Sequence, residues 1–254
     1  MIKFFRKIRQ RLLTENKFSK YLLYAIGEII LVVIGILIAL AINNQNEIRK
    51  NKGYESQYLI GIKSNINQDI KELENHYKTD TIKFDSNTYL IRTFNSDSAK
   101  SKTQEILSNI YSSFDINWFE GQNVVFEDMK SSGKMQLIKH DAIRLQIQIY
   151  YRLFEEVIKQ EKIFNSEIRE LQQAIESEIN MSSLLEPIFP EKWNANVAPF
   201  NLSFLDKPSV KAKMINNLSG IKARQFSNHL VRKQLYQQAK GLKKEIVQSL
   251  TNKK

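Results

Sequence analysis

The run from Tyr21 to Ile42 is almost entirely apolar, and Glu28 is its only charged residue. At ~1.5 Å per residue, a helix over this run would be about 33 Å long, enough to cross a bilayer core of about 30 Å. The sequence therefore predicts a single transmembrane helix over residues 21–42, with the lipid bilayer as its surroundings. Every other segment must be interpreted as part of a membrane-tethered protein.

Basic residues are distributed unequally around this run. The preceding flank contains Lys3, Arg6, Lys7, Arg9, Arg11, Lys17 and Lys20, whereas the first stretch after the run contains only Arg49, Lys50 and Lys52. This bias predicts a cytoplasmic N-terminus and an extracytoplasmic region over 43–254. The alternative is a signal peptide cleaved at Ala39-Leu40-Ala41, but the apolar regions of signal peptides are only about 7–15 residues long. The longer run favours an uncleaved signal-anchor.

Residues 1–20 also have a helical pattern of their own. Phe5, Ile8 and Leu12 would share one face of a helix, and the opposite face would be basic. This pattern predicts a cytoplasmic amphipathic segment on an anionic leaflet. The alternative, which is compatible with it, is that the basic residues only set the topology.

One face of the predicted transmembrane helix carries a candidate packing site. Glu28, Val32, Gly35 and Ala39 recur at helical spacing, and Gly35 and Ala39 form a small-xxx-small pair that permits close helix approach. A partner helix on this face would shelter the costly carboxylate of Glu28. Alternatively, Glu28 is protonated or reaches interfacial water.

Composition excludes several classes of site and partner. The chain has no cysteine, so a disulfide framework, a thiol nucleophile and a cysteine-based metal site are excluded. Its formal net charge is +11, but beyond the apolar run the two signs interleave along the predicted helices. Interleaved charge is typical of a solvated helical surface, and we expect no nucleic-acid partner.

Helical periodicity dominates the outer region. Apolar residues at spacings of three and four predict a helix over 59–77 that continues from the membrane span, with possible bends at Gly53 and Gly61. Shorter helices are expected near 82–95 and 101–114. The strongest pattern predicts a helix over 141–178. Its apolar stripe consists of Ile143, Ile147, Tyr150, Phe154, Val157, Glu161, Phe164, Ile168, Leu171 and Ile175. Leu145, Ile149 and Leu153 are expected to widen this stripe in the first half of the helix. So wide a stripe suits a helical bundle better than a two-stranded coiled coil.

In the rest of the chain, glycine and proline residues predict where helices end and where a loop lies. Gly133 is expected to end a short helix that begins after Asn123. All four prolines fall within 187–208, which predicts a loop whose aromatic residues pin it to the bundle. A last helix is expected over 221–250, through Phe226, Leu230, Leu235, Leu242 and Ile246, with Gly220 separating it from a helix near 208–218. The predicted fold class is all-α, with one transmembrane helix followed by an antiparallel bundle of long helices.

The chain contains several specific motifs: MIKFFRKIRQ at 1–10, ENKF at 15–18, YLLYAIGE at 21–28, GILIAL at 35–40, and FEDMKSSGKMQLI at 126–138 ahead of the Tyr150-Tyr151 pair. These motifs resemble those of a family of uncharacterised single-pass membrane-anchored proteins of Bacteroidota. The family form usually has a tryptophan just after the span, where this chain has Gln45, so an interfacial aromatic anchor is missing. The resemblance implies an envelope protein of unknown function, and it carries no catalytic residues. It agrees with the topology predicted above, which corresponds to a single-pass inner-membrane protein with a periplasmic C-terminal domain.

No catalytic motif is visible, and we expect neither enzymatic activity nor a cofactor. The chain has no H-E-x-x-H, G-x-S-x-G, G-x-x-x-x-G-K-[ST] or G-x-G-x-x-G sequence. Glu72 and His76 have the i, i+4 spacing of two metal ligands, but zinc needs three or four. An exposed helical pair is the favoured interpretation, and no metal site is predicted.

Two functions remain as hypotheses. The first is an interaction or scaffold module that binds another envelope protein or a second copy of itself. The second is a ligand-binding sensor domain that signals through a partner protein, because helical bundles place small-molecule sites between facing helices. Candidate ligand or partner contacts are Trp118, Tyr150, Tyr151 and Trp193.

Overall fold

The structure, a computed structural model, describes residues 18–97, 99–185 and 200–251. The α-helices are α2 (Phe18–Phe94), α3 (Thr103–Phe114), α4 (Val124–Ser131), α5 (Asp141–Glu176), α6 (Met181–Leu185) and α8 (Pro208–Thr251). Short 3-10 helices are η1 (Ala99–Lys102), η2 (Lys134–Leu137) and η3 (Ser203–Asp206). These described ranges contain no β-strand, so the predicted all-α fold is confirmed.

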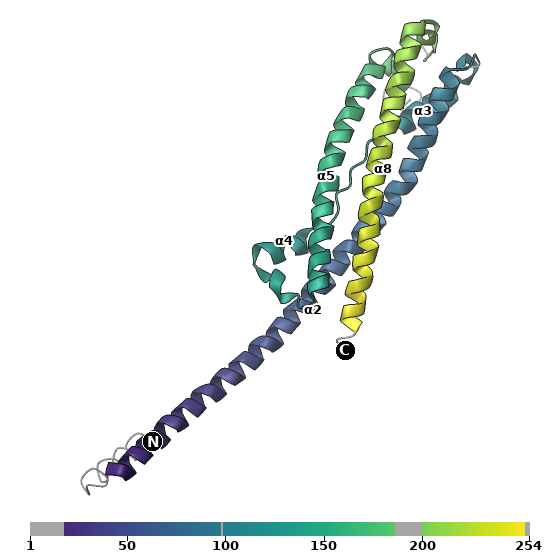
Figure 1. The fold of residues 1–254 in the computed structure, drawn as a ribbon. Coiled ribbons are helices and arrows are strands. Elements are labelled where there is room, and N and C mark those ends of the chain that lie inside the picture. The colour runs from purple at the N-terminus through teal and green to yellow at the C-terminus, as the bar shows by residue number, and fades with distance from the viewer. Residues whose placement is uncertain (1–17, 98, 186–199, 252–254) are drawn as a thin grey trace. The chain divides into compact units, whose positions relative to one another are not determined.

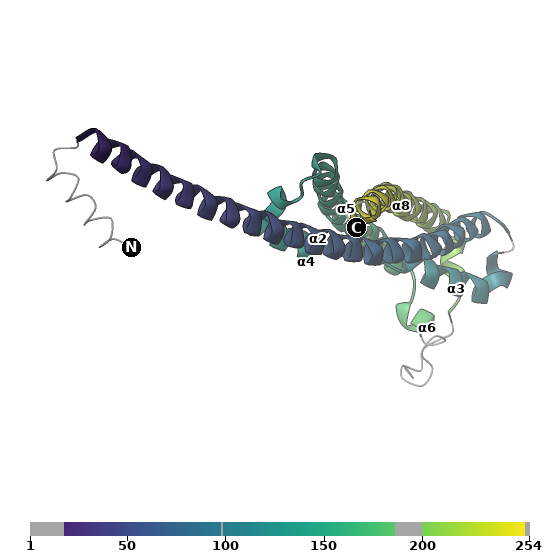
Figure 2. The same ribbon diagram turned by 90° about the horizontal axis from the view of Figure 1, so that it is seen from below.

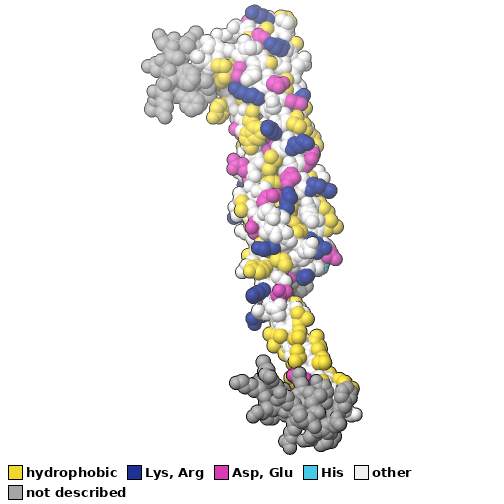
Figure 3. All heavy atoms as spheres, turned by 90° about the vertical axis from the view of Figure 1, so that its left-hand side faces the viewer, with side chains coloured by type: hydrophobic (Ala, Val, Ile, Leu, Met, Phe, Trp, Pro, Cys, Tyr) yellow, Lys and Arg dark blue, Asp and Glu magenta, His cyan; other side chains and the backbone are white. Residues whose placement is uncertain are grey.

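The chain divides into two units, Met1–Ser56 and Gln57–Lys254. In the first unit, the described residues form the beginning of α2, which carries a stretch of mean hydropathy 2.9 with none of it buried. This helix is long and apolar enough to cross a membrane. The exposed hydrophobic side chains of this stretch are among those coloured yellow in Figure 3. The predicted amphipathic segment at 1–20 lies almost entirely outside the described residues.

Helix α2 continues without a break where separate helices were expected. The prediction of another helix over 82–95 is wrong, because α2 extends to Phe94. Beyond its earlier apolar residues, the buried face of α2 continues through the polar residues Asp80, Lys83 and Asn87, which recur at the same helical spacing. At Gly61, a Cβ would lie only 3.0 Å from Val125 Cγ1, so this glycine permits close packing of α4.

The long helices of the second unit are not all antiparallel. Asp69 on α2 accepts a hydrogen bond from Tyr150 on α5, and further along both helices Leu90 and Ile168 share one apolar core. Helices α2 and α5 therefore run in the same direction, which corrects the predicted antiparallel arrangement. The physical reason is the connection: α3 and the irregular segment 115–123 lead the chain back along the bundle before α5 begins (Figure 1).

Helix α8 runs against both of the others. Its later residue Tyr236 donates to Glu74 of α2, and its earlier residue Gln225 accepts from Asn87, which lies further along α2. Helix α8 also packs along α5, beside which it lies in both ribbon views (Figures 1 and 2). The second unit is thus a three-helix bundle of mixed direction, flanked by α3, α4 and the short helices.

Two apolar cores lie along this bundle, one toward each end. The first unites Leu59 to Leu73 of α2 with Ile143 to Val157 of α5 and the last turns of α8. The second unites Leu90 and Phe94 with Ile168, Ile175 and the first turns of α8. Between them, each long helix turns polar side chains inward: Asp80, Lys83 and Asn87 on α2, Glu161 and Asn165 on α5, and Gln225, Asn228 and Arg232 on α8.

The buried face of α5 differs from the predicted stripe in its second half. Asn165 and Gln172 are buried, whereas Phe164 and Leu171 are only half-buried. A straight helix has 3.6 residues per turn, so residues chosen at an average spacing of 3.5 gradually rotate away from the core along the helix. In the second half of α5, the buried position is therefore the residue after the predicted one. In the first half, Tyr151 is buried and Leu145 is exposed, so the predicted widening of the stripe at Leu145 is wrong.

The predicted break and apolar face of α8 are also corrected. Gly220 lies inside a continuous helix, where a Cβ would come within 2.9 Å of Leu171 Cδ1. Close contact with α5 therefore explains this glycine. Phe226 and Leu230 belong to the apolar series that predicted this helix, but they are 52% and 48% exposed, since the inward positions of this stretch are polar.

Two local predictions agree with the structure. Gly133 has a φ of 68°, the left-handed conformation expected of a glycine that ends a helix. In the described part of the proline-containing segment, Phe200 is buried and Phe204 packs edge-on against Phe94. These aromatic residues pin the end of that segment to the second apolar core.

Candidate functional site

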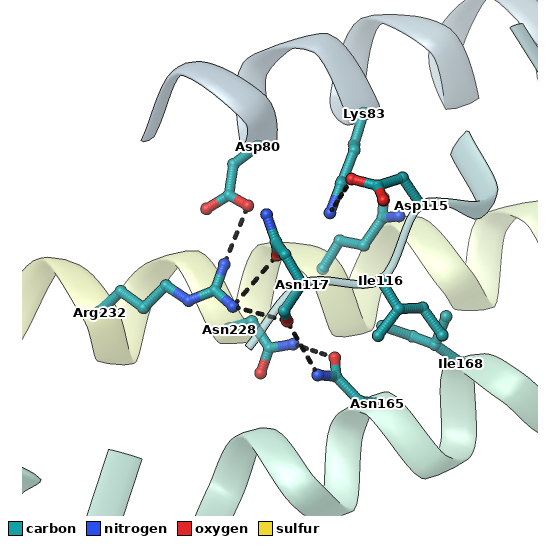
Figure 4. Close-up of a pocket in the computed structure, with 10 residues that line it drawn as sticks. Asp80, Lys83, Asp115, Ile116, Asn117, Asn165, Ile168, Asn228 and Arg232 are labelled. Carbon is teal, nitrogen blue, oxygen red and sulfur yellow. Dashed lines mark hydrogen bonds and ion pairs between the residues drawn. The ribbon is translucent and has the colours of Figure 1, made fainter. Parts of the chain in front are cut away.

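The polar layer between the two cores is organised by Arg232, which is 1% exposed (Figure 4). Its Nε donates to Glu161 Oε1 at 2.5 Å, and its Nη1 donates to Asp80 Oδ1 at 3.1 Å. Its Nη2 donates to both the backbone and the side-chain oxygen of Asn117. One guanidinium thus joins all three long helices and the segment 115–123.

Amide side chains satisfy the carbonyl groups of the chain that enters this segment. Gln225 donates to Ser113 O, Gln172 donates to Phe114 O, and Asn165 donates to Asn117 O, at distances of 2.9–3.1 Å. Asn165 in turn accepts a hydrogen bond from Asn228. The amides of α5 and α8 therefore stand in for the backbone partners that a strand or helix would supply.

Carboxylates satisfy the N–H groups further along the same segment. Glu161 Oε2 accepts from Phe119 N, Glu72 accepts from Glu120 N and Gly121 N, and Asp69 Oδ1 accepts from Gln122 N. Residues 115–123 form no regular secondary structure, so unpaired backbone groups there would be costly. The polar layer and these carboxylates therefore hold an irregular segment against the bundle.

The two α2 carboxyl groups that contact this segment have opposite pKa shifts. Burial raises the pKa of Asp69 to about 6, although hydrogen bonds from Tyr150 and Gln122 N partly oppose that rise and the nearby charge of Glu72 adds to it. Burial also favours a higher pKa for Glu72. There, however, the neighbouring His76 ring and hydrogen bonds from the N–H groups of Glu120 and Gly121 outweigh burial and lower the pKa.

Lys83 closes one side of the polar layer. Its Nζ lies 3.2 Å from Asp115 Oδ2. Burial lowers the pKa of Lys83, and the neighbouring Asp115 charge opposes that effect. The small cavity among Lys83, Asn228 and their neighbours has a volume of about 10 Å³, which is room for about one water molecule. A metabolite does not fit in this cavity.

Glu72 and His76 have no further metal-ligating side chains beside them among the described residues. His76 Nε2 lies 3.6 Å from Glu72 Oε1, as the i, i+4 spacing suggested. Within the described ranges, no group of three His, Asp or Glu side chains could hold a metal ion. His76 is buried, which corrects the expectation of an exposed pair.

A ladder of aromatic rings lies between α2 and α8. It runs Tyr236, Tyr77, His229, Phe84, Phe226, and successive ring centroids are 5.1–6.0 Å apart. His229 Nδ1 lies 3.3 Å from Asp80 Oδ2, which links this ladder to the polar layer. The outer end is open to solvent, because Phe226 and Leu230, one turn apart on α8, are both about half exposed.

An open groove of about 620 Å³ lies between segment 114–118 and α5. Phe114, Ile116 and Trp118 form its apolar wall, and Lys162, Ser166 and Arg169 line it from α5. Trp118 is 50% exposed, whereas Phe119 beside it is buried. Residues of an extended segment point to alternate sides, which explains why one neighbour faces the core and the other faces the groove.

The predicted contact residues have different environments. Trp118 lies in the groove, while Trp193 lies outside the described residues. Tyr150 and Tyr151 are 0% and 1% exposed, so they belong to the core rather than to a contact surface. Tyr151 stacks on Phe126, and the Tyr150 hydroxyl donates to Asp69 at 2.6 Å. Large aromatic side chains adjacent on a helix can both be buried when neighbouring elements cover a wide face.

On the predicted transmembrane packing face, Val32, Gly35 and Ala39 are exposed and Glu28 is half-buried. A Cβ added to Gly35 would meet no other atom within 4 Å. The face is therefore open to close approach by another helix, and packing against a partner stays a prediction.

Sequence reasoning missed the inward-facing residues Gln225, Asn228 and Arg232. Their signal was present in the spacing. The buried positions of α8 are Met214, Leu218, Ile221, Gln225, Asn228, Arg232, Leu235, Ala239, Leu242 and Ile246. These alternate by four and three without interruption, so a search for periodicity that ignored polarity would have found the correct face.

Comparison with protein families gives one result. A model described as a family of unknown function, DUF6090, matches residues 28–184. Neither the curated proteins nor the solved structures compared with this chain give a match. The matched region contains the α2 and α5 contributions to the polar layer and the segment 115–123, while Arg232 and the rest of α8 lie beyond it.

Proposed function

The chain belongs to the DUF6090 family of unknown function, and we propose that it is a membrane-anchored interaction or scaffold module. In this proposal the apolar part of α2 anchors the protein, and the helical bundle binds another envelope protein or a second copy of the chain. The observation that carries the proposal is the solvent-exposed end of the aromatic ladder, at Phe226 and Leu230.

The proposed topology is that of an uncleaved signal-anchor in an inner membrane, with the bundle in the periplasm. The support is the apolar stretch near the N-terminus, at mean hydropathy 2.9, together with the excess of basic residues before it. The resemblance to membrane-anchored proteins of Bacteroidota supports the same location. A reporter fused after Thr251 tests it: alkaline phosphatase should be active, and a cytosolic green fluorescent protein signal would contradict the topology.

The exposed ladder favours a protein contact for a physical reason. Two large apolar side chains one turn apart on α8 are left in water, while the positions beside them that face inward are polar. Aromatic residues are enriched in interfaces because they bury a large area at a low entropic cost. The face of the molecule drawn in Figure 3 mixes both signs of charge. Other apolar residues of the bundle, such as Ile158 and Ile163, are also exposed, but Phe226 differs from them because its ring continues the aromatic ladder between α2 and α8.

Photocrosslinking in native membranes tests this surface. With p-benzoylphenylalanine at Phe226, we expect a discrete adduct, and its mass distinguishes a second copy from a different protein. The same probe at Leu145, an exposed apolar residue of α5, is the matched control and should give no such adduct. Equal crosslinking at both positions, or none at Phe226, would overturn the assignment of the surface.

We also propose a non-catalytic role for the polar layer. Its guanidinium, amide and carboxyl groups are engaged with the backbone of segment 113–122 or with one another. Groups engaged in this way stabilise a chain conformation. The amide oxygens of Asn87 and Asn228 accept no hydrogen bond from the described residues, but an amide is not an acid–base group.

A ligand-binding sensor is the second candidate function, and the groove beside Trp118 is the observation that favours it. Its volume of about 620 Å³ falls within the 300–1,000 Å³ range that is common for small-molecule sites. A sensor of this kind would pass its signal to a partner protein.

A further inference from the structure

The apolar wall of the Trp118 groove is linear. It consists of Phe114, the last residue of α3, followed by Ile116 and Trp118 in segment 115–123. At ~3.3 Å per residue for an extended chain, these three side chains span at most about 13 Å. A narrow apolar stripe of this length complements a flexible hydrocarbon chain better than a compact ring system.

The opposite wall supplies an uncommitted positive charge. Arg169 Nη1 already pairs with Glu176 at 3.1 Å. Lys162, by contrast, has no ion pair among the residues that the structure describes, and Ser166 follows it by one turn on the same face of α5. A single free ammonium group beside a hydroxyl group complements a monoanion that accepts hydrogen bonds, such as a carboxylate.

We propose that this groove binds an acyl carboxylate, that is, a fatty acid. Its chain lies along Phe114, Ile116 and Trp118, and its carboxylate lies at Lys162 within reach of the Ser166 hydroxyl. The inference rests on the second candidate function, ligand binding, and is independent of the α2–α8 contact surface. It adds the chemical class of the ligand, and the single charge that Lys162 offers is the reason for choosing a monoanion over a phosphate dianion.

Tryptophan fluorescence provides a direct test, because the chain contains only Trp118 and Trp193. The Trp193→Phe variant of the full chain, in lipid nanodiscs, leaves Trp118 as the single reporter. The probe is 8-bromooctanoate, whose bromine quenches an indole on contact, and 8-bromooctanol is the uncharged analogue. Circular dichroism checks that each variant keeps its helicity, and Trp193→Tyr replaces Trp193→Phe if the latter does not fold.

We expect saturable quenching by 8-bromooctanoate. Lys162→Gln should weaken that binding about threefold to fivefold, since an ion pair in an open groove contributes modestly. It should leave quenching by 8-bromooctanol unchanged. The matched control is Lys159→Gln, which removes an exposed cation from α5 outside the groove and should alter neither ligand.

The possible failures are distinguishable. Saturable quenching by acid and alcohol alike, with no effect of Lys162→Gln, would overturn the carboxylate assignment but leave the groove as an apolar ligand site. The absence of saturable quenching by either probe would overturn both the acyl ligand and the ligand-binding function.

Discussion

Arg232 Nε on α8 donates to Glu161 Oε1 on α5 at 2.5 Å, and both side chains are 1% exposed. Neither charge is isolated, because Arg232 also contacts Asp80 and Asn117. Taking two charges out of water is expensive, and their attraction compensates only when the remaining donors and acceptors are satisfied. This pair is therefore stable only as part of the complete polar layer.

Replacing Arg232 by Leu should lower the free energy of unfolding by about 3–5 kcal/mol, because Glu161 and Asp80 would remain buried without their partner. Arg224→Leu on the same helix is the control. Its pair with Glu167 is partly exposed, and its loss should cost less than about 1 kcal/mol. Urea unfolding of the full chain in detergent, followed by circular dichroism, measures both. Equal effects would show that the buried layer contributes no more than a surface pair.

Asp69→Asn should change how stability depends on pH. The carboxyl pKa is about 6 in the folded chain, against 3.8 for an aspartate side chain in water, so the folded state holds this proton more tightly. The contribution of Asp69 to the free energy of unfolding therefore falls as pH rises from about 4 to 6. The amide oxygen of an asparagine could accept from Gln122 N, and its amide nitrogen could donate to the Tyr150 oxygen, which reverses the hydrogen bond that Tyr150 donates to Asp69.

The measurement for Asp69→Asn is the thermal midpoint of both chains between pH 4 and 7.5. We expect the variant to lose less stability than the parent chain as the pH rises through this window. Glu72, whose pKa is lowered, has the opposite dependence, but it is present in both proteins and cancels in the difference. Parallel pH profiles would contradict the assignment.

Gly121→Ala should be strongly destabilising, by more than about 2 kcal/mol, since it combines backbone strain with overpacking. Its φ is 56°, and an added Cβ would lie 2.2 Å from the ring of Phe154. Gly133→Ala is the matched control, because its φ of 68° is equally left-handed but no atom lies within 4 Å of the added Cβ. Its cost should be about 1–2 kcal/mol. Calorimetry of the two variants should rank them in this order.

Glu28→Leu should change the association of the predicted transmembrane helix in membranes, if a partner helix shelters this carboxyl group. The chain has no native cysteine, so Ala39→Cys gives a single disulfide-crosslinking position. Leu37→Cys, on the opposite side of the helix, is the control. We expect Ala39 crosslinks that weaken when Glu28 is replaced, and an unchanged crosslinking pattern would contradict the packing face.

The helices were more predictable than their connections. Apolar spacing predicted α5 over 141–178, close to the observed Asp141–Glu176, and predicted the short helix that Gly133 ends. The same spacing wrongly predicted that α2 is divided near residue 82 and α8 at Gly220, because polar residues interrupt the apolar stripe there. The helix itself does not end at these points, since its buried face continues through Lys83 and Gln225.

The candidate sites were only partly predictable. Trp118 was predicted to be a ligand or partner contact, and it lines the groove. Tyr150 and Tyr151 were predicted to have the same role, yet both are in the core. Tyr150 and Tyr151 are buried because α4 and segment 115–123 cover that side of α5. The sequence pattern of α5 alone does not show which of its sides other elements cover.

By itself, the sequence determined that this chain is helical, that one stretch of it suits a membrane, and which residues of each helix recur on one face. These are local properties, because 3.6-residue periodicity and apolar length act within a single segment. Only the tertiary structure decided that α2 and α5 run in the same direction, and that Asp80, Glu161 and Arg232 meet. A buried charge is stable only beside partners from distant segments, so its position depends on the whole bundle.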